Sequence, residues 1–393
     1  MKGICLVMLL GGLLAIPSFG QGGLEKYVGQ YQVTGAGLVI TVTAENGKLA
    51  LQATGQPKAE LELISGDNYE IKGAPIKITF QSDAAGKVTG LVIHQSGVDV
   101  PAAKMNSSSE APSDKSPHKS EFVTANGIKM NYLDWGGAGD VIILLSGFGN
   151  DAHIFDEFAT AFTDKFHVIG LTRRGFGETE RPATGYDTTT RVEDIRAFMD
   201  AKKIKRAHLV GHSLAGDEMT MFATLHPNRL LKLVYLDAAY DRTKMVTCAD
   251  ELPPEIAPPA AIRMMREAME CPGWAEIKVK DMPPPDMYRV QVLTMRSASQ
   301  YRPAYKDVKA LSLSIYADAE VAQLPGNVTD ETRKRLEAYW KEKRTPLTRA
   351  SIEQFRKEMP NGRVVELKGA THYIFLGPSK DETIKLTRDF LAK

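Results

Sequence analysis

The sequence has few of the features that mark nucleic-acid-binding, membrane-spanning or disulfide-rich proteins. It holds three cysteines in 393 residues, and 49 basic residues against 48 acidic ones give a formal net charge of +1. So balanced a charge does not point to nucleic acid or an anionic membrane as a partner. No cluster of metal-ligating residues and no phosphate-cradling glycine loop stands out, so we expect neither a metal nor an organic cofactor.

Long apolar runs are also scarce, and the one near the start of the chain is too short for a comfortable membrane span. It covers Ile4–Phe19, follows the positively charged Lys2, and ends with the small residues Ser18 and Gly20 at the −3 and −1 positions of a cleavage site. This pattern predicts a cleaved secretory signal at residues 1–20 and a periplasmic or secreted mature chain without a membrane span. An uncleaved anchor is the alternative.

Removal of that signal leaves two cysteines, Cys248 and Cys271. An even number of cysteines in an oxidising compartment favours a disulfide bond between them. Two buried free thiols are the alternative.

Short alternating runs with turn residues between them predict a small antiparallel β domain at residues 21–105. The stretch LVITVTAENGKLALQAT alternates on both sides of Asn46-Gly47, a strong hairpin signal, and Asp83 to Gly86 makes another turn. We expect a barrel or a strongly curved sheet. The segments YVGQYQV, GQPKAELE and GKVTGLVIHQSG resemble a domain appended to secreted beta-lactamase-like serine hydrolases. No catalytic constellation stands out in it, so we expect a binding or spacing role.

A segment rich in Ser, Pro, Lys and Asp follows at residues 106–119 and predicts a solvated interdomain linker. From residue 120 to 393, continuous apolar strands such as VIILL alternate with amphipathic helices such as TRVEDIRAFMDAKKI. This alternation predicts an α/β domain with a mostly parallel sheet covered by helices on both faces.

The stretch LVGHSLAG places Ser213 where an apolar strand ends and a helix begins. In a nucleophile elbow the serine occupies a strained turn, and its neighbours at −2 and +2 must be small. Gly211 and Ala215 meet that requirement, although Ala215 departs from the usual G-x-S-x-G pattern. Ser213 is therefore the candidate nucleophile.

Residues 120–393 resemble an α/β-hydrolase-fold enzyme, because LLSGFGN, LTRRGFGETERP, LVGHSLAG, LVYLDAAY and GATHYIFL occur in that family's order and spacing. The resemblance implies that His372 is the general base for Ser213. It further implies an oxyanion hole made by the main-chain N–H groups of Leu214 and Phe148.

The acid that orients His372 has three candidates at this stage. Glu320 is preferred, because it follows the strand LSLSIYA at the spacing where the family's acid normally stands. Asp237, one strand earlier at the end of LVYLDA, is the alternative acid, and Asp318 is the third candidate.

The segment between these strands, at about residues 240–308, is rich in Pro and Met and is interpreted as a cap over the active site. Met264, Met265 and Met269 could line an adaptable apolar pocket or pack the cap onto the body.

Together these patterns predict a secreted serine hydrolase that cleaves an ester-like or amide-like bond of a small-molecule substrate through an acyl-enzyme. Carbon–carbon bond hydrolysis or a lyase reaction on the same fold is one alternative. A non-catalytic ligand-binding protein is another. The sequence leaves the oligomeric state open.

Overall fold

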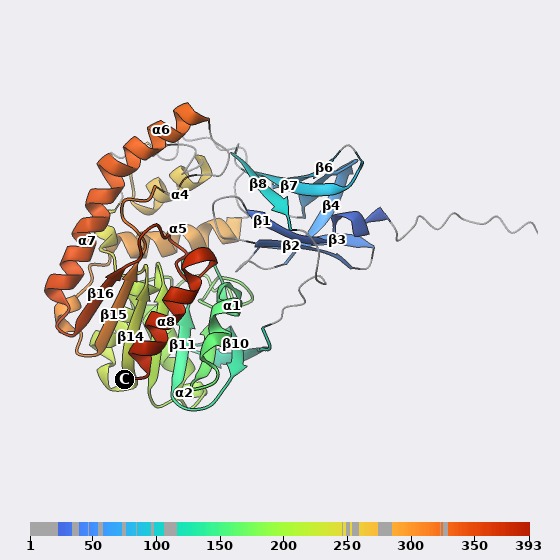
Figure 1. Cartoon of the computed structure of the whole chain (residues 1–393). Helices are drawn as coiled ribbons and strands as arrows, with labels where there is room; N and C mark the ends of the chain where they lie inside the picture. The colour runs from blue at the N-terminus through green and yellow to red at the C-terminus, as the bar shows by residue number, and fades with distance from the viewer. Residues whose placement is uncertain are drawn as a thin grey trace, which may run out of the picture.

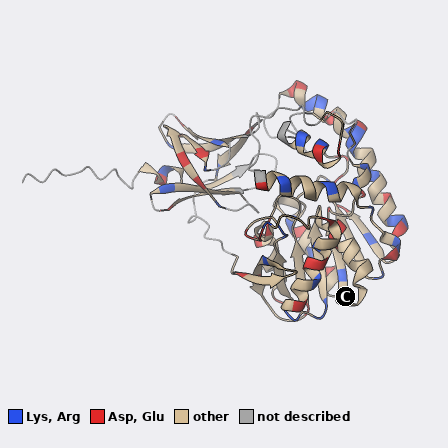
Figure 2. Cartoon of the chain, turned by 180° about the vertical axis from the view of Figure 1, so that it is seen from behind, with Lys and Arg blue, Asp and Glu red and all other residues tan. Residues whose placement is uncertain are grey.

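A computed structural model describes the chain at residues 23–33, 39–45, 47–53, 58–72, 76–83, 85–95, 98–105, 116–245, 247–248, 252–253, 259–273, 285–322, 324 and 329–393. The predicted signal at residues 1–20 and most of the predicted linker lie outside the described residues. Two parts are visible in Figure 1, a β barrel and a larger layered α/β domain. Residues of both charge signs are interspersed along both parts (Figure 2).

The first part is a closed barrel of eight antiparallel strands, which confirms the predicted all-β domain. Neighbouring strands pair antiparallel, and Glu45 at the end of β2 pairs with Lys48 at the start of β3, as expected for the predicted hairpin. The strands are β1 (Gly29–Val33), β2 (Val39–Glu45), β3 (Lys48–Ala53), β4 (Ala59–Ser65), β5 (Asn68–Ile71), β6 (Lys77–Ser82), β7 (Val88–Gln95) and β8 (Val98–Lys104).

Alternate side chains of these strands fill the barrel. Tyr31, Ile40, Val42, Ile78 and Leu91 are fully buried in it. Because each strand alternates one inward and one outward residue, the apolar half of the pattern forms a packed core and the polar half faces solvent.

The second part is built on an eight-stranded sheet in the order β16-β15-β14-β13-β11-β12-β10-β9. The pairs from β12 across to β16 are parallel, whereas β10 runs antiparallel to both of its neighbours. Its strands are β9 (Lys119–Ala125), β10 (Ile128–Gly136), β11 (Val141–Leu145), β12 (His167–Leu171), β13 (Ala207–His212), β14 (Leu230–Leu236), β15 (Leu311–Tyr316) and β16 (Gly362–Glu366).

Helices cover both faces of this sheet, as predicted. On β11, Ile143 and Leu145 belong to one buried cluster, while Ile142 and Leu144 belong to the other. A strand whose two faces are both buried must be apolar throughout, which explains the run VIILL. The helices are α1 (Asp156–Ala159), α2 (Thr188–Ala201), α3 (Ala215–Leu225), α4 (Pro259–Ala268), α5 (Pro285–Gln300), α6 (Asp330–Tyr339), α7 (Thr345–Glu358) and α8 (Lys380–Leu391).

Two insertions between strands carry helices toward the carboxyl edge of the sheet. Helices α4 and α5 lie between β14 and β15, and they form the predicted cap (Figure 1). Helices α6 and α7 lie between β15 and β16 and are joined by a π-helical turn, η9 (Trp340–Arg344). A helix of the length and apolarity needed to cross a membrane does not occur among the described residues.

The last residues of the predicted linker are ordered against the second domain. Ser116 accepts a hydrogen bond from the indole N–H of Trp135, and β9 already begins at Lys119. His118 packs edge-on against the same indole. The described end of the segment at residues 106–119 is therefore part of the domain rather than solvated linker.

Candidate active site

Ser213 occupies a strained turn between β13 and α3. Its φ angle is +52°, in the left-handed region that side-chain-bearing residues rarely adopt. The turn is tight because a Cβ added at Gly211 would lie 2.3 Å from Met219 Sδ and 2.9 Å from Ala215 Cβ. This geometry is that of a nucleophile elbow, in which the serine hydroxyl stands clear of the sheet.

The usual G-x-S-x-G pattern has glycine where this chain has Ala215, and the structure explains why alanine is accommodated. Ala215 is fully buried and its methyl group fits beside Gly211. The following residue, Gly216, cannot carry a side chain, because an added Cβ would lie 2.0 Å from the carbonyl oxygen of Ala238 at the end of β14. The close approach of α3 to the neighbouring strand thus falls at the third residue after Ser213.

His372 reaches this turn from the loop that follows β16. Its Nε2 lies 2.9 Å from Ser213 Oγ, and its Nδ1 lies 2.6 Å from Asp237 Oδ2. Asp237 follows β14, the strand next to β13, and is 2% exposed. The structure therefore brings a serine, a histidine and a carboxylate into one continuous line of contacts.

The Asp237 carboxylate is held on both oxygens. Oδ1 accepts hydrogen bonds from the Tyr240 hydroxyl and from the main-chain N–H of Ala317 at 2.9 Å, which leaves Oδ2 to His372. Burial, reinforced by the Asp237 charge, raises the pKa of Tyr240 well above its usual range, so its hydroxyl stays protonated and can donate. These bonds fix the direction in which the carboxylate faces the imidazole.

Glu320, the acid preferred from the sequence, does not contact His372. Its side chain is exposed and pairs with the Arg349 guanidinium at 3.2 Å. Asp318 is used locally, because it accepts hydrogen bonds from the N–H groups of Glu320 and Gly369. The geometry thus reverses the order of the candidates, since the end of β14 lies closer to the β13 turn than the end of β15 does.

The loop after β11 lies directly against Ser213. A Cβ added at Gly147 would be 3.0 Å from Ser213 Cβ and 2.8 Å from His212 Nδ1, so this position must be glycine. Arg173 fixes the loop from behind, because its guanidinium donates to the carbonyl oxygens of Ser146 at 2.7 Å and Gly147 at 3.1 Å. The loop that carries Phe148 is therefore rigidly placed beside Ser213.

Arg173 in turn belongs to a buried charge network. It donates to Glu218 on α3 at 2.6 Å, and Arg191 on α2 donates to the same carboxylate at 2.8 Å. Burial of Glu218 opposes its ionisation, but the two guanidinium groups outweigh that effect and lower the pKa of its carboxyl. One ionised glutamate thereby connects the loop after β11 to the helix that follows Ser213.

Two further side chains hold the loops that carry Ser213 and His372, and sequence reasoning gave neither this role. His212 contacts the carbonyl oxygen of His372 through Nε2 at 3.1 Å, and burial lowers the pKa of its imidazole well below the usual value. A neutral His212 can therefore donate to that carbonyl. Arg242 donates to the carbonyl oxygen of Ser213 at 2.6 Å and to Asp217 at 2.5 Å. Arg242 lies two residues after the LVYLDAAY stretch, and no pattern in the sequence indicated this role.

A cavity of about 280 Å³ opens over Ser213 and His372. Met265 and Met269 of the cap line it, as predicted, whereas Met264 is 9% exposed and packs against the other cap helix. The structure pairs Cys248 with Cys271, so the predicted disulfide is present. Cys248 precedes α4 in the chain and Cys271 follows it. Sequence reasoning missed the wall formed by the segment between α6 and α7, which supplies Trp340 and Arg344, and by the start of α7, which supplies Thr348.

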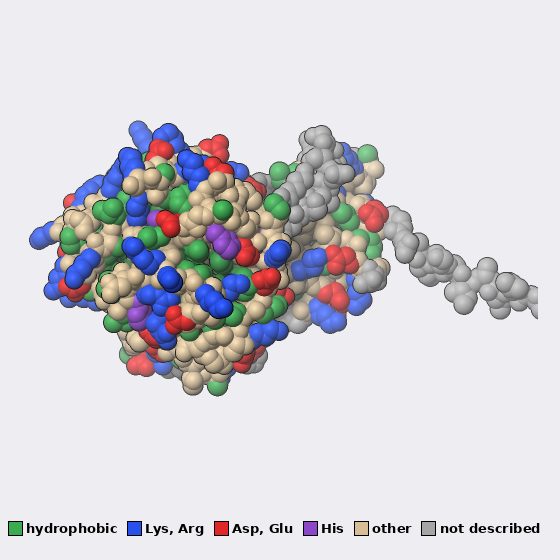
Figure 3. Space-filling model, turned by 90° about the horizontal axis from the view of Figure 1, so that it is seen from below, with side chains coloured by type: hydrophobic (Ala, Val, Ile, Leu, Met, Phe, Trp, Pro, Cys, Tyr) green, Lys and Arg blue, Asp and Glu red, His purple; other side chains and the backbone are tan. Residues whose placement is uncertain are grey.

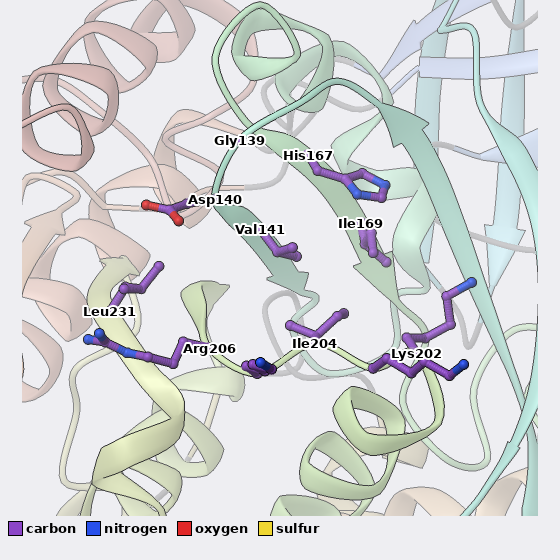
Figure 4. Close-up of a pocket in the computed structure, with 11 residues that line it drawn as sticks. Gly139, Asp140, Val141, His167, Ile169, Lys202, Ile204, Arg206 and Leu231 are labelled. Carbon is purple, nitrogen blue, oxygen red and sulfur yellow. The ribbon is translucent and has the colours of Figure 1, made fainter.

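A second, larger cavity lies at the opposite edge of the sheet, near the amino ends of β11 and β13 (Figure 4). Lys202, Lys203, Lys205 and Arg206 line it, and none of its lining residues is a serine or cysteine. Lys and Arg side chains also gather on the face seen from below (Figure 3). The four basic residues that line the cavity follow the carboxyl end of α2, where positive charge stabilises the helix. We therefore place the candidate active site in the smaller cavity.

Within the described residues, one group of side chains has a spacing that could suit a metal ion. His118, His153 and Asp156 offer ligand atoms within 4.8 Å of one another. His153 Nδ1 already lies 3.0 Å from Asp156 Oδ2, and the His118 and His153 rings stack edge to face. These contacts attach the segment before β9 to the domain.

Comparison with known proteins agrees with this architecture. Residues 140–267 match the family described as the alpha/beta hydrolase fold, and residues 21–108 match a domain of unknown function (DUF3471). A protein named as the carbamate hydrolase RutD of Caulobacter segnis is 33% identical over 117 residues, which are 29% of this chain and 44% of that protein. The non-heme chloroperoxidase of Streptomyces lividans is 31% identical over 137 residues, 34% of this chain and 50% of that protein.

The chain thus spans half or less of the length of these relatives. Among solved structures, Cfl2 from Burkholderia cenocepacia superposes with a TM-score of 0.50 at 17% identity, covering 72% of this chain and 98% of that one. That likeness shows the fold alone. The second domain has the α/β hydrolase fold, and its relatives are hydrolases and other enzymes of that fold. Their named activities differ, so similarity does not select a substrate.

Proposed function

We propose that this chain is a secreted serine hydrolase that cleaves an ester-like or amide-like bond of a small substrate through an acyl-enzyme. The observation that carries the proposal is the line of contacts from Ser213 Oγ to His372 Nε2 at 2.9 Å and from His372 Nδ1 to Asp237 Oδ2 at 2.6 Å. A neutral imidazole in this position can accept the serine proton, and the carboxylate stabilises the imidazolium that forms.

In this mechanism Ser213 Oγ attacks the substrate carbonyl carbon while its proton passes to His372 Nε2. His372 then gives that proton to the leaving group, and an activated water releases the acyl group by the same route. Main-chain N–H groups of Phe148 and Leu214 would stabilise the tetrahedral oxyanion. Within the described part of the chain, neither N–H donates to another protein group, and the Phe148 loop lies against Ser213.

Two observations support export from the cytoplasm. The first 20 residues have the pattern of a secretory signal, and the disulfide between Cys248 and Cys271 is of the kind that persists in oxidising compartments. Recovery of mature protein beginning at residue 21 from the periplasm or medium would test this part of the proposal.

A fluorophosphonate probe tests the nucleophile directly, because it reacts covalently with an activated serine hydroxyl. We expect labelling of the wild type and of Ser299→Ala, a control serine that also lines the cavity, and no labelling of Ser213→Ala. The wild type should also hydrolyse a short-chain aryl ester, and Ser213→Ala should not. Equal labelling of all three proteins would contradict the assignment of Ser213.

A further inference from the structure

The cavity over Ser213 combines an apolar body with a cationic group. Met245, Met265, Met269 and Met295 give it flexible apolar walls, and Arg344 lies on the wall formed by the segment between α6 and α7. A substrate pocket that is mostly apolar uses its few polar groups to orient the ligand. Polar groups of this cavity that take no part in the hydrolytic steps are therefore candidates for binding and orienting the substrate.

The main chain around Arg344 has an unusual form. The N–H of Thr345 donates to the carbonyl oxygen of Trp340, five residues earlier, which makes one π-helical turn between two α-helices. Such turns are rare and frequently occur at functional sites. Trp340, Arg344 and Thr348 follow one another at four-residue spacing and all three line the cavity. The insertion thus presents a continuous row of side chains to the space above Ser213.

The Arg344 guanidinium retains unused donors. It donates through Nη1 to the carbonyl oxygen of Met245 at 3.0 Å and lies over the Trp340 ring with its carbon 5.8 Å from the ring centroid. No carboxylate of the described residues forms an ion pair with it. Arg242, the other arginine on the cavity wall, differs, because its guanidinium is committed to Asp217 and to the carbonyl oxygen of Ser213.

A guanidinium has five N–H donors in a planar fork that matches the two oxygens of a carboxylate. Because Arg344 is partly buried, lies over an indole ring and has no carboxylate partner in the described chain, its guanidinium suits an anionic group brought by a ligand.

We propose that Arg344 is a specificity-determining residue, and that the substrate carries a carboxylate which Arg344 binds while the methionines hold its apolar body. This inference rests on the proposed hydrolytic function, and it narrows the substrate to an anionic ester or amide.

Two matched pairs of esters test the inference. Mono-para-nitrophenyl adipate and para-nitrophenyl hexanoate differ by a carboxylate on the acyl chain. Para-acetoxybenzoate and its methyl ester differ by a carboxylate on the leaving group. We expect the wild type to prefer the anionic member of at least one pair by about tenfold or more in kcat/KM, since hydrogen bonds to charged groups have strengths of that order.

Arg344→Gln should lower kcat/KM for the preferred anionic ester by about ten- to hundredfold, mainly by raising KM, and leave its neutral partner within about twofold. Arg344→Lys, which keeps the charge but not the fork, should retain part of the preference. Lys343→Gln is the matched control, because it removes the same charge from the same turn at an exposed position that does not line the cavity. It should leave both esters within about twofold.

Three outcomes overturn the inference. These are no preference for the anionic member in either pair, an unchanged preference in Arg344→Gln, or an equal loss on anionic and neutral esters in a variant whose thermal unfolding is unchanged. If such a result is found while neutral esters are hydrolysed and the fluorophosphonate labels Ser213, the inference alone fails. If no ester is hydrolysed and Ser213 is not labelled, the proposed function fails instead.

Discussion

At the scale of single residues, Asp237 is placed by three separate constraints. It has a positive φ angle of 47°, its side chain is buried, and its carboxylate is bound by Tyr240, Ala317 and His372. A left-handed conformation costs a residue that carries a side chain some energy, and it persists where the surrounding structure holds it in place. The same position directs one carboxylate oxygen at the imidazole Nδ1.

Asp237→Asn removes the charge while it keeps the side-chain size, and it can stabilise the wrong imidazole tautomer. We expect kcat for a neutral aryl ester to fall by about 10³- to 10⁴-fold, the order of the loss that the equivalent change causes in a serine protease. Glu320→Gln is the matched control and should lose less than about threefold, because the Glu320 side chain pairs with Arg349 and does not contact His372. A large loss in Glu320→Gln with near-normal Asp237→Asn would show that the contact to Asp237 has no role in turnover.

At the scale of elements, one buried carboxylate ties three elements to the site. Glu218 on α3 is 2% exposed and binds Arg191 on α2 and Arg173, which also holds the loop that begins at Ser146. Removing one member of a buried ion cluster leaves the other charges without compensation, and this costs more than loss of a surface pair.

Glu218→Gln should therefore lower the free energy of unfolding by about 3–5 kcal/mol at pH 7, measured by urea denaturation. Glu193→Gln is the control on α2, because Glu193 forms surface pairs with Arg196 and His226, and it should cost less than about 1 kcal/mol. Similar losses in both variants would mean that the buried network is not specially coupled to stability.

At the scale of the whole molecule, we expect the free energy of unfolding at acidic pH to depend on histidines that are buried in the core. His208 on β13 is 3% exposed, and within the described residues neither of its ring nitrogens has a hydrogen-bond partner. Burial lowers the pKa of His208 to about 4, although Asp140 at 4.0 Å opposes the shift. The unfolded chain binds this proton near pH 6.5 and the folded chain only near pH 4, so the free energy of unfolding falls as pH drops between those values.

His208→Leu removes this titration. Between pH 7.5 and 5.0 the variant should lose about 2 kcal/mol less unfolding free energy than the wild type, whatever its absolute stability. Urea denaturation of both proteins at the two pH values measures the difference. Parallel losses would place the acid sensitivity elsewhere, for example at His212, whose pKa burial also lowers.

The sequence by itself determined the features that depend on local pattern. Alternating strands predicted the barrel, continuous apolar runs such as VIILL predicted a sheet covered on both faces, and small neighbours placed Ser213 in a tight turn. These features follow from side-chain periodicity and from sterics within a few residues, so they can be predicted without knowledge of the fold's dimensions. The role of His372 came from the resemblance of the motifs to the α/β-hydrolase family and not from a local pattern.

The tertiary structure alone decided which distant groups meet. Asp237 and Glu320 both follow strands of the same sheet, but only β14 lies beside β13, and only Asp237 has a tyrosine and a main-chain N–H to aim its carboxylate. Arg344 lies 131 residues beyond Ser213 in the chain, and the pairing of β14, β15 and β16 brings its helical insertion over the site. Sheet order and strand register set these distances, and neither is encoded in the residues that surround each side chain.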